Sequence, residues 1–191
     1  MYLLRNLVDR LRGLPPAEHF VVRGIPVRVE NTRPDIDTAR VLAQLDAALA
    51  LVEGHQPWRF RHLQRDLSHI VVKRFACRGA YFYAERACLT ELTFLANPSF
   101  NAAQVASSIV HEGVHARVHA MGVTYDGPDR RDREERLCRE AELAFGLAVP
   151  PALGVPVVER AVALLESADV DLAPEIDWAE AQRRIDEVDR R

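Results

Sequence analysis

Long apolar runs, lysine and cysteine are all scarce in this 191-residue sequence, and each scarcity narrows what the chain can be. No stretch approaches the roughly 20 apolar residues of a membrane-spanning helix, so we expect no integral membrane association. Lys73 is the only lysine, the arginines form no basic block, and the formal net charge is −3. Nothing in this charge pattern indicates nucleic-acid binding.

The three cysteines, Cys77, Cys88 and Cys138, are odd in number and match no zinc-knuckle spacing. We interpret them as reduced, mostly buried thiols in a reducing compartment. Residues 1–16 have no uninterrupted apolar core and no small-residue cleavage site, so the sequence predicts no signal peptide and a cytoplasmic protein. Leucines at helical spacing in 1–14 predict a helix that docks on the protein's own core in preference to a membrane surface.

The order of apolar patterns predicts an α+β fold in one domain, 1–191. We expect a small, mostly antiparallel sheet packed on a pair of helices, with further helices at both ends. The predicted strand regions are 19–31, 69–75, 79–85 and 87–94, and the predicted helices are 35–54, 57–67, 102–121, 131–148, 157–167 and 177–189. Within the domain, 1–56 is an N-terminal extension, 57–150 holds the sheet and the two central helices, and 151–191 holds C-terminal helices.

The segment 107–122 carries the chemistry, because it contains His-x-x-x-His with an intervening glutamate at His111, Glu112 and His115. Residues four apart lie on one face of a helix, so both imidazoles point the same way, and neutral imidazole is a good zinc ligand. Glu112 lies beside the pair and can act as general base on an activated water. The helix has few charges and is expected to be buried, where these polar groups need partners. A zinc ion would supply them; core hydrogen bonds are the alternative.

A catalytic zinc needs a third protein ligand. His119 lies one turn beyond His115, but three ligands along one straight helix spread too far along its axis. We therefore interpret His119 as a supporting or substrate-facing group, or as ordinary packing. The glycine and the third histidine of the metzincin pattern are also missing. A carboxylate from the helix predicted at 131–148 remains, and Glu134 and Glu135 come first in it. Helical angle alone does not decide between these two.

A His-Glu-x-x-His helix followed by a glutamate on the next helix resembles the gluzincin zinc peptidases. Their two best-known spacings would select Glu135 or Glu134 as third ligand. The run 135–145 also resembles small uncharacterised bacterial metallopeptidases in which an E-x-x-C segment follows the zinc helix. That resemblance favours Glu135, with Glu142 as a partner behind the ligands. The further signatures of thermolysin-like enzymes and of aminopeptidases are absent, so no substrate class is carried over.

The resemblance implies a zinc-dependent peptidase that works by the promoted-water mechanism on a peptide or protein substrate, with narrow specificity. Zn²⁺ would be held by His111, His115 and Glu135, and Glu112 would move the proton. The alternative is a non-catalytic, zinc-binding regulatory or interaction module on the same scaffold.

Two supporting roles complete the sequence-based hypothesis. The strand near 90–94 is expected to lie at a sheet edge and to pair with an extended peptide substrate. A tetrahedral intermediate also needs a donor besides the metal, and Tyr125, His119 and Arg131 are the candidates.

Overall fold

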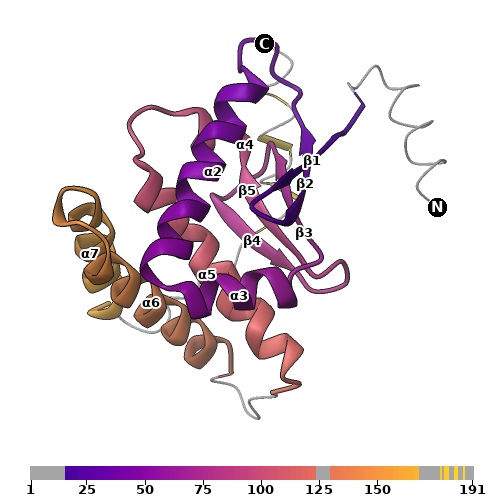
Figure 1. Cartoon of the computed structure of the whole chain (residues 1–191). Coiled ribbons are helices and arrows are strands. Elements are labelled where there is room, and N and C mark those ends of the chain that lie inside the picture. The colour runs from indigo at the N-terminus through magenta and orange to yellow at the C-terminus, as the bar shows by residue number, and fades with distance from the viewer. Residues whose placement is uncertain are drawn as a thin grey trace.

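The computed structural model describes residues 16–123 and 130–167, with residues 177, 179, 180, 183, 184 and 187. The expected first helix and most of the helix expected at 177–189 lie outside these residues. Within the described part, no helix combines the length and the apolar character needed to cross a membrane. The predicted α+β class is confirmed: helices pack on one five-stranded sheet (Figure 1).

The sheet has the order β1-β2-β3-β5-β4. Its strands are β1 (Glu18–Val22), β2 (Ile25–Glu30), β3 (His69–Lys73), β4 (Gly79–Phe82) and β5 (Ala87–Glu91). The two outer pairings, β1 with β2 and β4 with β5, are antiparallel as predicted. The two central pairings are parallel. They are parallel because a helical crossover joins β2 to β3, and because β5 returns from the β4 hairpin to lie between β3 and β4.

Apart from α4, the helices agree closely with the sequence-based expectations. They are α2 (Thr38–His55), α3 (Pro57–Asp66), α4 (Leu92–Ala96), α5 (Ala102–Ala120), α6 (Arg130–Ala148) and α7 (Pro151–Leu165). Asp37 caps α2, since its carboxylate accepts from the Ala39 amide. The α7 helix starts six residues earlier than predicted, because a proline in the first helical turn loses no hydrogen bond.

The prediction of a strand at 87–94 is wrong about where the strand ends and about its place in the sheet. The chain turns into α4 at Leu92, because the Glu91 carboxylate caps that helix by accepting from the Phe94 amide at 2.7 Å. In addition, β5 lies between β3 and β4, so both of its edges are paired. The role of an edge strand for substrate, predicted near 90–94, is therefore overturned. The strand at this edge of the sheet is β4.

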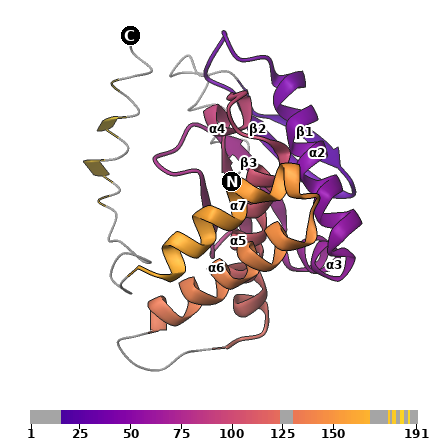
Figure 2. The ribbon, with the colours of Figure 1, turned by 90° about the vertical axis from the view of Figure 1, so that its left-hand side faces the viewer.

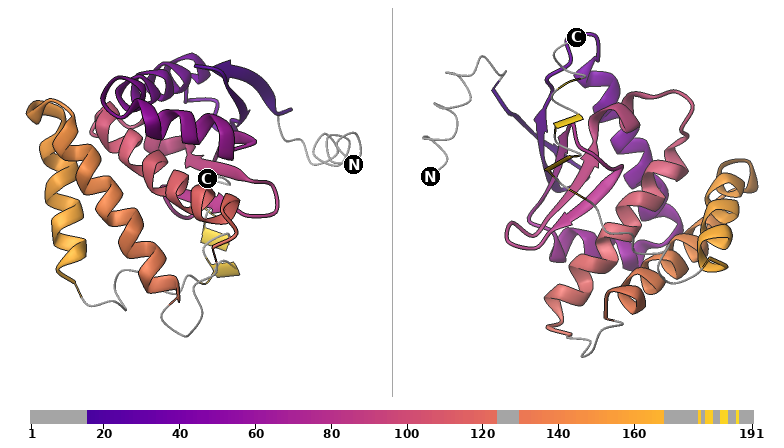
Figure 3. Two further views of the ribbon diagram at one scale, coloured as in Figure 1. Left: turned by 60° about the horizontal axis from the view of Figure 1, so that its bottom comes forward. Right: turned by 180° about the vertical axis from the view of Figure 1, so that it is seen from behind.

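Helix α5 lies at the centre of the molecule, against β4, β5, α2, α3, α6 and α7. A reciprocal capping box between Asn101 and Gln104 starts it, and Gly122, at a φ of 62°, follows its end. Figure 3 shows the helices on one face of the sheet, with α6 and α7 beyond α5. This position buries the face of α5 that carries the His-Glu-x-x-His sequence.

The pair α6 and α7 is held at very short range by a glycine. A Cβ on Gly154 would meet the backbone oxygen of Gly146 at 2.1 Å, and backbone cannot yield as a side chain can. We expect Gly154→Ala to lower the free energy of unfolding by about 1–3 kcal/mol, measured by urea denaturation. Gly54→Ala is the matched control, since a Cβ at Gly54 in α2 meets nothing within 4 Å. Equal stability of Gly154→Ala and the wild type would contradict this packing.

Candidate metal centre

The two histidines of α5 face a row of acidic and sulfur-bearing side chains on α6. Figure 2 shows α5, α6 and α7 close together, and α5 is in contact with both of the later helices. Residues at intervals of three and four share a helix face, so Glu135, Cys138 and Glu142 all reach α5 from the same side of α6. His111 is 7% exposed and Glu142 only 1% exposed, so their polar atoms depend on protein partners.

Each imidazole is held by a carboxylate at its Nδ1 atom. His111 Nδ1 lies 2.6 Å from Glu142 Oε1, and His115 Nδ1 lies 2.7 Å from Glu134 Oε1. An ionised carboxylate can only accept, so each Nδ1 carries the hydrogen and donates it. Both Nε2 atoms are therefore free to bind a cation. This is the arrangement in which an outer carboxylate fixes the tautomer of a metal-binding histidine.

The Nε2 atoms converge on one point together with Glu135 and Cys138. The two Nε2 atoms are 3.3 Å apart. Glu135 Oε2 lies 3.2 Å from His111 Nε2, and Glu135 Oε1 lies 3.5 Å from His115 Nε2. Cys138 Sγ lies 3.6 Å from His115 Nε2, and its sulfur and both imidazoles offer ligand atoms within 4.8 Å of one another. The group of His111, His115 and Cys138 could hold a metal ion, and Glu135 borders it through the two imidazoles.

The separations fit the size of a tetrahedral zinc site. Zinc–nitrogen bonds of 2.0–2.1 Å at tetrahedral angles place two nitrogens about 3.4 Å apart, close to the observed 3.3 Å. A zinc–sulfur bond near 2.3 Å places sulfur and nitrogen about 3.6 Å apart, which the Cys138–His115 distance matches. The residues present therefore fit a zinc ion in both chemistry and spacing.

The electrostatics also favour a cation. Burial by itself would lower the pKa of His111, but the charges of Cys138 and Glu112 and hydrogen bonds to Glu135 and Glu142 raise that pKa to about 10. Burial would likewise raise the pKa of Glu135, but hydrogen bonds from both imidazoles hold it well below its ordinary range. The surrounding carboxylates thus draw positive charge onto the two rings, and a divalent ion could take the place of those protons.

Glu112 is buried on the sheet side of α5, beside β4. A Cβ on Gly79 of β4 would meet Glu112 Oε1 at 2.8 Å and Ser108 Oγ at 2.6 Å, so this carboxylate packs directly against Gly79. Burial raises the pKa of Glu112, and the positive charges of His111 and His115 oppose that rise. The pKa of Glu112 therefore depends on its burial and on the charges of His111 and His115.

The structure distinguishes the two candidates for the third ligand, Glu134 and Glu135, and places one candidate donor, His119. Glu135 lies at both Nε2 atoms, whereas Glu134 lies behind His115 at Nδ1, where the Tyr83 hydroxyl also donates to it at 3.2 Å. His119 is exposed, and its Nδ1 lies 2.9 Å from the hydroxyl of Tyr81 on β4.

The structure does not test the other two predicted donors. Arg131 is exposed in the first turn of α6. Tyr125 lies outside the described residues.

Cys138 is the residue that sequence analysis did not assign to the site. All three cysteines are free thiols, as predicted, and Cys138 is fully buried. Its spacing from Glu135, three residues along a helix, was the available signal, because such residues share a face. The sequence analysis instead interpreted all three cysteines as reduced, mostly buried thiols.

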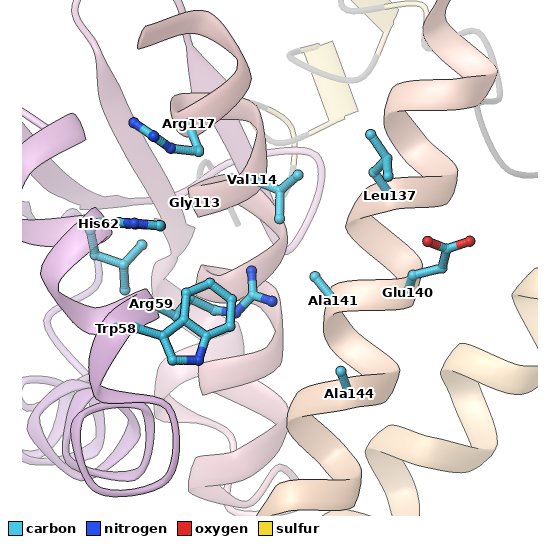
Figure 4. A pocket seen from close by; sticks show the side chains of 11 residues that line it. Trp58, Arg59, His62, Gly113, Val114, Arg117, Leu137, Glu140, Ala141 and Ala144 are labelled. Carbon is cyan, nitrogen blue, oxygen red and sulfur yellow. The ribbon is translucent and has the colours of Figure 1, made fainter. Parts of the chain in front are cut away.

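A separate cavity of about 370 Å³ lies between α3, α5 and α6. Figure 4 shows Trp58, Arg59 and His62 on one side of it and Leu137, Ala141 and Ala144 on the other. Its α5 residues are Gly113, Val114 and Arg117, none of which carries the metal-binding nitrogens. The cavity therefore flanks the α5–α6 contact and does not include the metal centre.

Replacing Glu142 by glutamine should weaken metal binding without removing a ligand. The carboxylate accepts from His111 Nδ1 and from Ser107 Oγ, and it forms ion pairs with Arg139 and Arg160. Glu142→Gln loses the charge that holds the ring and leaves two arginines unbalanced. We expect zinc affinity to fall about 10–100-fold, measured by competition with a chelating dye. Glu159→Gln, on the adjacent helix, is the control, and unchanged affinity in Glu142→Gln would contradict this role.

No protein-family model matches the chain, and no curated protein or solved structure matches it either.

Proposed function

We propose that this protein is a zinc-dependent hydrolase that cleaves peptide bonds. One observation carries the proposal: Glu135 and the Nε2 atoms of His111 and His115 meet at one point, with Glu112 buried beside them. Two imidazoles, one carboxylate and an adjacent second carboxylate are the set that promoted-water hydrolysis requires. The resemblance to gluzincins at the same residues supports this proposal.

When bound, a zinc ion would polarise a carbonyl group and lower the pKa of water towards about 7. His111 and His115 present Nε2 to it, because Glu142 and Glu134 keep hydrogen on Nδ1. Glu112 accepts the water proton on its carboxylate and passes it to the leaving amine. Its burial suits this second step, since burial raises its pKa towards that of a useful acid.

The free edge of β4 supports a peptide as substrate. Among the described residues, β4 pairs only with β5, so its outer edge is available for main-chain hydrogen bonds. Gly79 of β4 lies against Glu112. An extended peptide that joined this edge would run beside the general base, and its backbone would bind whatever its sequence.

A second candidate function is a zinc-binding module without catalysis, and the position of Cys138 favours it. Structural zinc sites use four protein ligands, whereas catalytic sites keep one position open. The sulfur of Cys138 stands where it could fill the fourth position. Hydrolysis, measured directly, separates the two candidates.

The test is cleavage of a mixed peptide library by zinc-loaded protein, followed by mass spectrometry. We expect cleavage that stops with a chelator and returns with zinc. Glu112→Gln should bind zinc as the wild type does and lose at least about 100-fold in rate, the effect of removing a general base. Glu140→Gln, an exposed change on α6, is the control. Metal-loaded protein that cleaves no peptide, either as the wild type or as Cys138→Ala, would reject the peptidase and leave the non-catalytic module.

A further inference from the structure

The centre offers one more donor than a catalytic zinc site needs. His111, His115 and Glu135 already provide three ligands, yet the Cys138 sulfur shares the same space. Cys138 comes from α6, one turn after Glu135, so the helix that presents the carboxylate also presents the sulfur.

The position of the sulfur suits a metal ligand. Its 3.6 Å distance to His115 Nε2 equals the separation expected for sulfur and nitrogen on one tetrahedral zinc ion, about 3.6 Å. Cys138 is 0% exposed, so the partners of its sulfur come from the interior of the protein. By contrast, Cys88 lies in the hydrophobic core and Cys77 contacts the Gly79 backbone oxygen.

We propose that Cys138 is a fourth protein ligand of the same metal ion and closes it to outside ligands in the resting protein. This inference rests on the metal centre of the proposed function and adds its regulation. The site has a His₂-Glu-Cys donor set, and substrate gains access only when the sulfur gives way. Replacing Cys138 therefore opens a coordination position and increases hydrolysis.

Cobalt(II) is the probe, because it takes the ligands of zinc, and thiolate coordination adds an intense near-ultraviolet charge-transfer band that imidazole and carboxylate do not give. We expect the band in wild-type protein at one cobalt per chain. The Cys77→Ala/Cys88→Ala double variant should keep it, since Cys138 is then the only cysteine. Cys138→Ser and Cys138→Ala should lose it while keeping the visible bands of bound cobalt.

Access is tested by adding azide to the same cobalt proteins. The visible spectrum of the wild type should not change, whereas that of Cys138→Ala should shift as azide enters the open position. Zinc-loaded Cys138→Ala should also cleave peptides at least about tenfold faster than the wild type.

Three results overturn the inference. Cobalt that binds the wild type without the near-ultraviolet band rejects the ligand role and leaves the proposed function intact. Loss of the band in the double variant rejects Cys138 as its source, and this variant decides the question even if the Cys138 variants do not fold. Failure of cobalt and zinc to bind the folded wild type rejects the metal centre itself. A thiolate band in the wild type, with no peptide cleavage by either the wild type or Cys138→Ala, supports the ligand role and rejects only the peptidase.

Discussion

Zinc is expected to raise the unfolding temperature of the wild-type chain by about 10 °C and to leave that of His111→Ala unchanged. A ligand at a thousand times its dissociation constant stabilises the folded state by about 4 kcal/mol. For a domain of this size each 1 kcal/mol shifts the midpoint by about 2–4 °C. The candidate ligands come from two consecutive helices, α5 and α6, and the packing of these helices in the folded chain brings them together.

The experiment distinguishes the effect of zinc on the unfolding temperature from the effect of removing the buried His111 ring. Thermal unfolding is followed by circular dichroism for each protein with excess zinc and with chelator, and the difference within each protein is the result. His55→Ala is the matched control, because His55 is exposed at the end of α2. It should keep the full zinc effect. An equal shift in His111→Ala and the wild type would show that zinc acts elsewhere on the chain.

Replacing Glu135 by glutamine is expected to weaken zinc binding by more than about 100-fold, and replacing Glu134 by only about 10–100-fold. Glu135 is the carboxylate that approaches both Nε2 atoms, at 3.2 and 3.5 Å. Glu134 instead accepts from His115 Nδ1, and a glutamine oxygen can still accept there. The first change removes a ligand charge, and the second weakens the orientation of one ring.

Zinc affinity is measured for both variants by competition with the same chelating dye, so that each serves as the reference for the other. Circular dichroism confirms that both are folded. A larger loss in Glu134→Gln than in Glu135→Gln would exchange the two roles and contradict the geometry of α6.

The sequence was enough to place most of the helices and to indicate that His111 and His115 lie together. His111 and His115 lie one turn apart in a helix with strong capping signals, and Glu142 was predicted to stand behind the ligands, where it holds His111. Local signals of this kind depend only on helical periodicity and on nearby side chains. They are therefore visible in the chain itself.

Local sequence could not decide between Glu134 and Glu135 as the third ligand. The choice depends on the rotation of α6 about its axis as it packs on α5, and neighbouring positions on a helix differ by about 100°. The sequence also did not show that α4 begins at Leu92, because the cap is the side chain of Glu91, a residue that fits a strand equally well. The same long-range packing placed β5 inside the sheet and made β4 the edge.

Cys138 was missed because it was considered among cysteines and not among its neighbours on α6. Its burial is common for a free thiol. Only the approach of α5 brings its sulfur to His115, and that contact joins residues 23 positions apart.

The most direct test of the central claim is elemental analysis of purified protein after dialysis without added metal. We predict one zinc per chain in the wild type and less than a tenth of that in His111→Ala and in Glu135→Ala, with both variants folded. Folded wild-type protein from zinc-supplemented cells that contains no stoichiometric metal, and takes up none on titration, would contradict it.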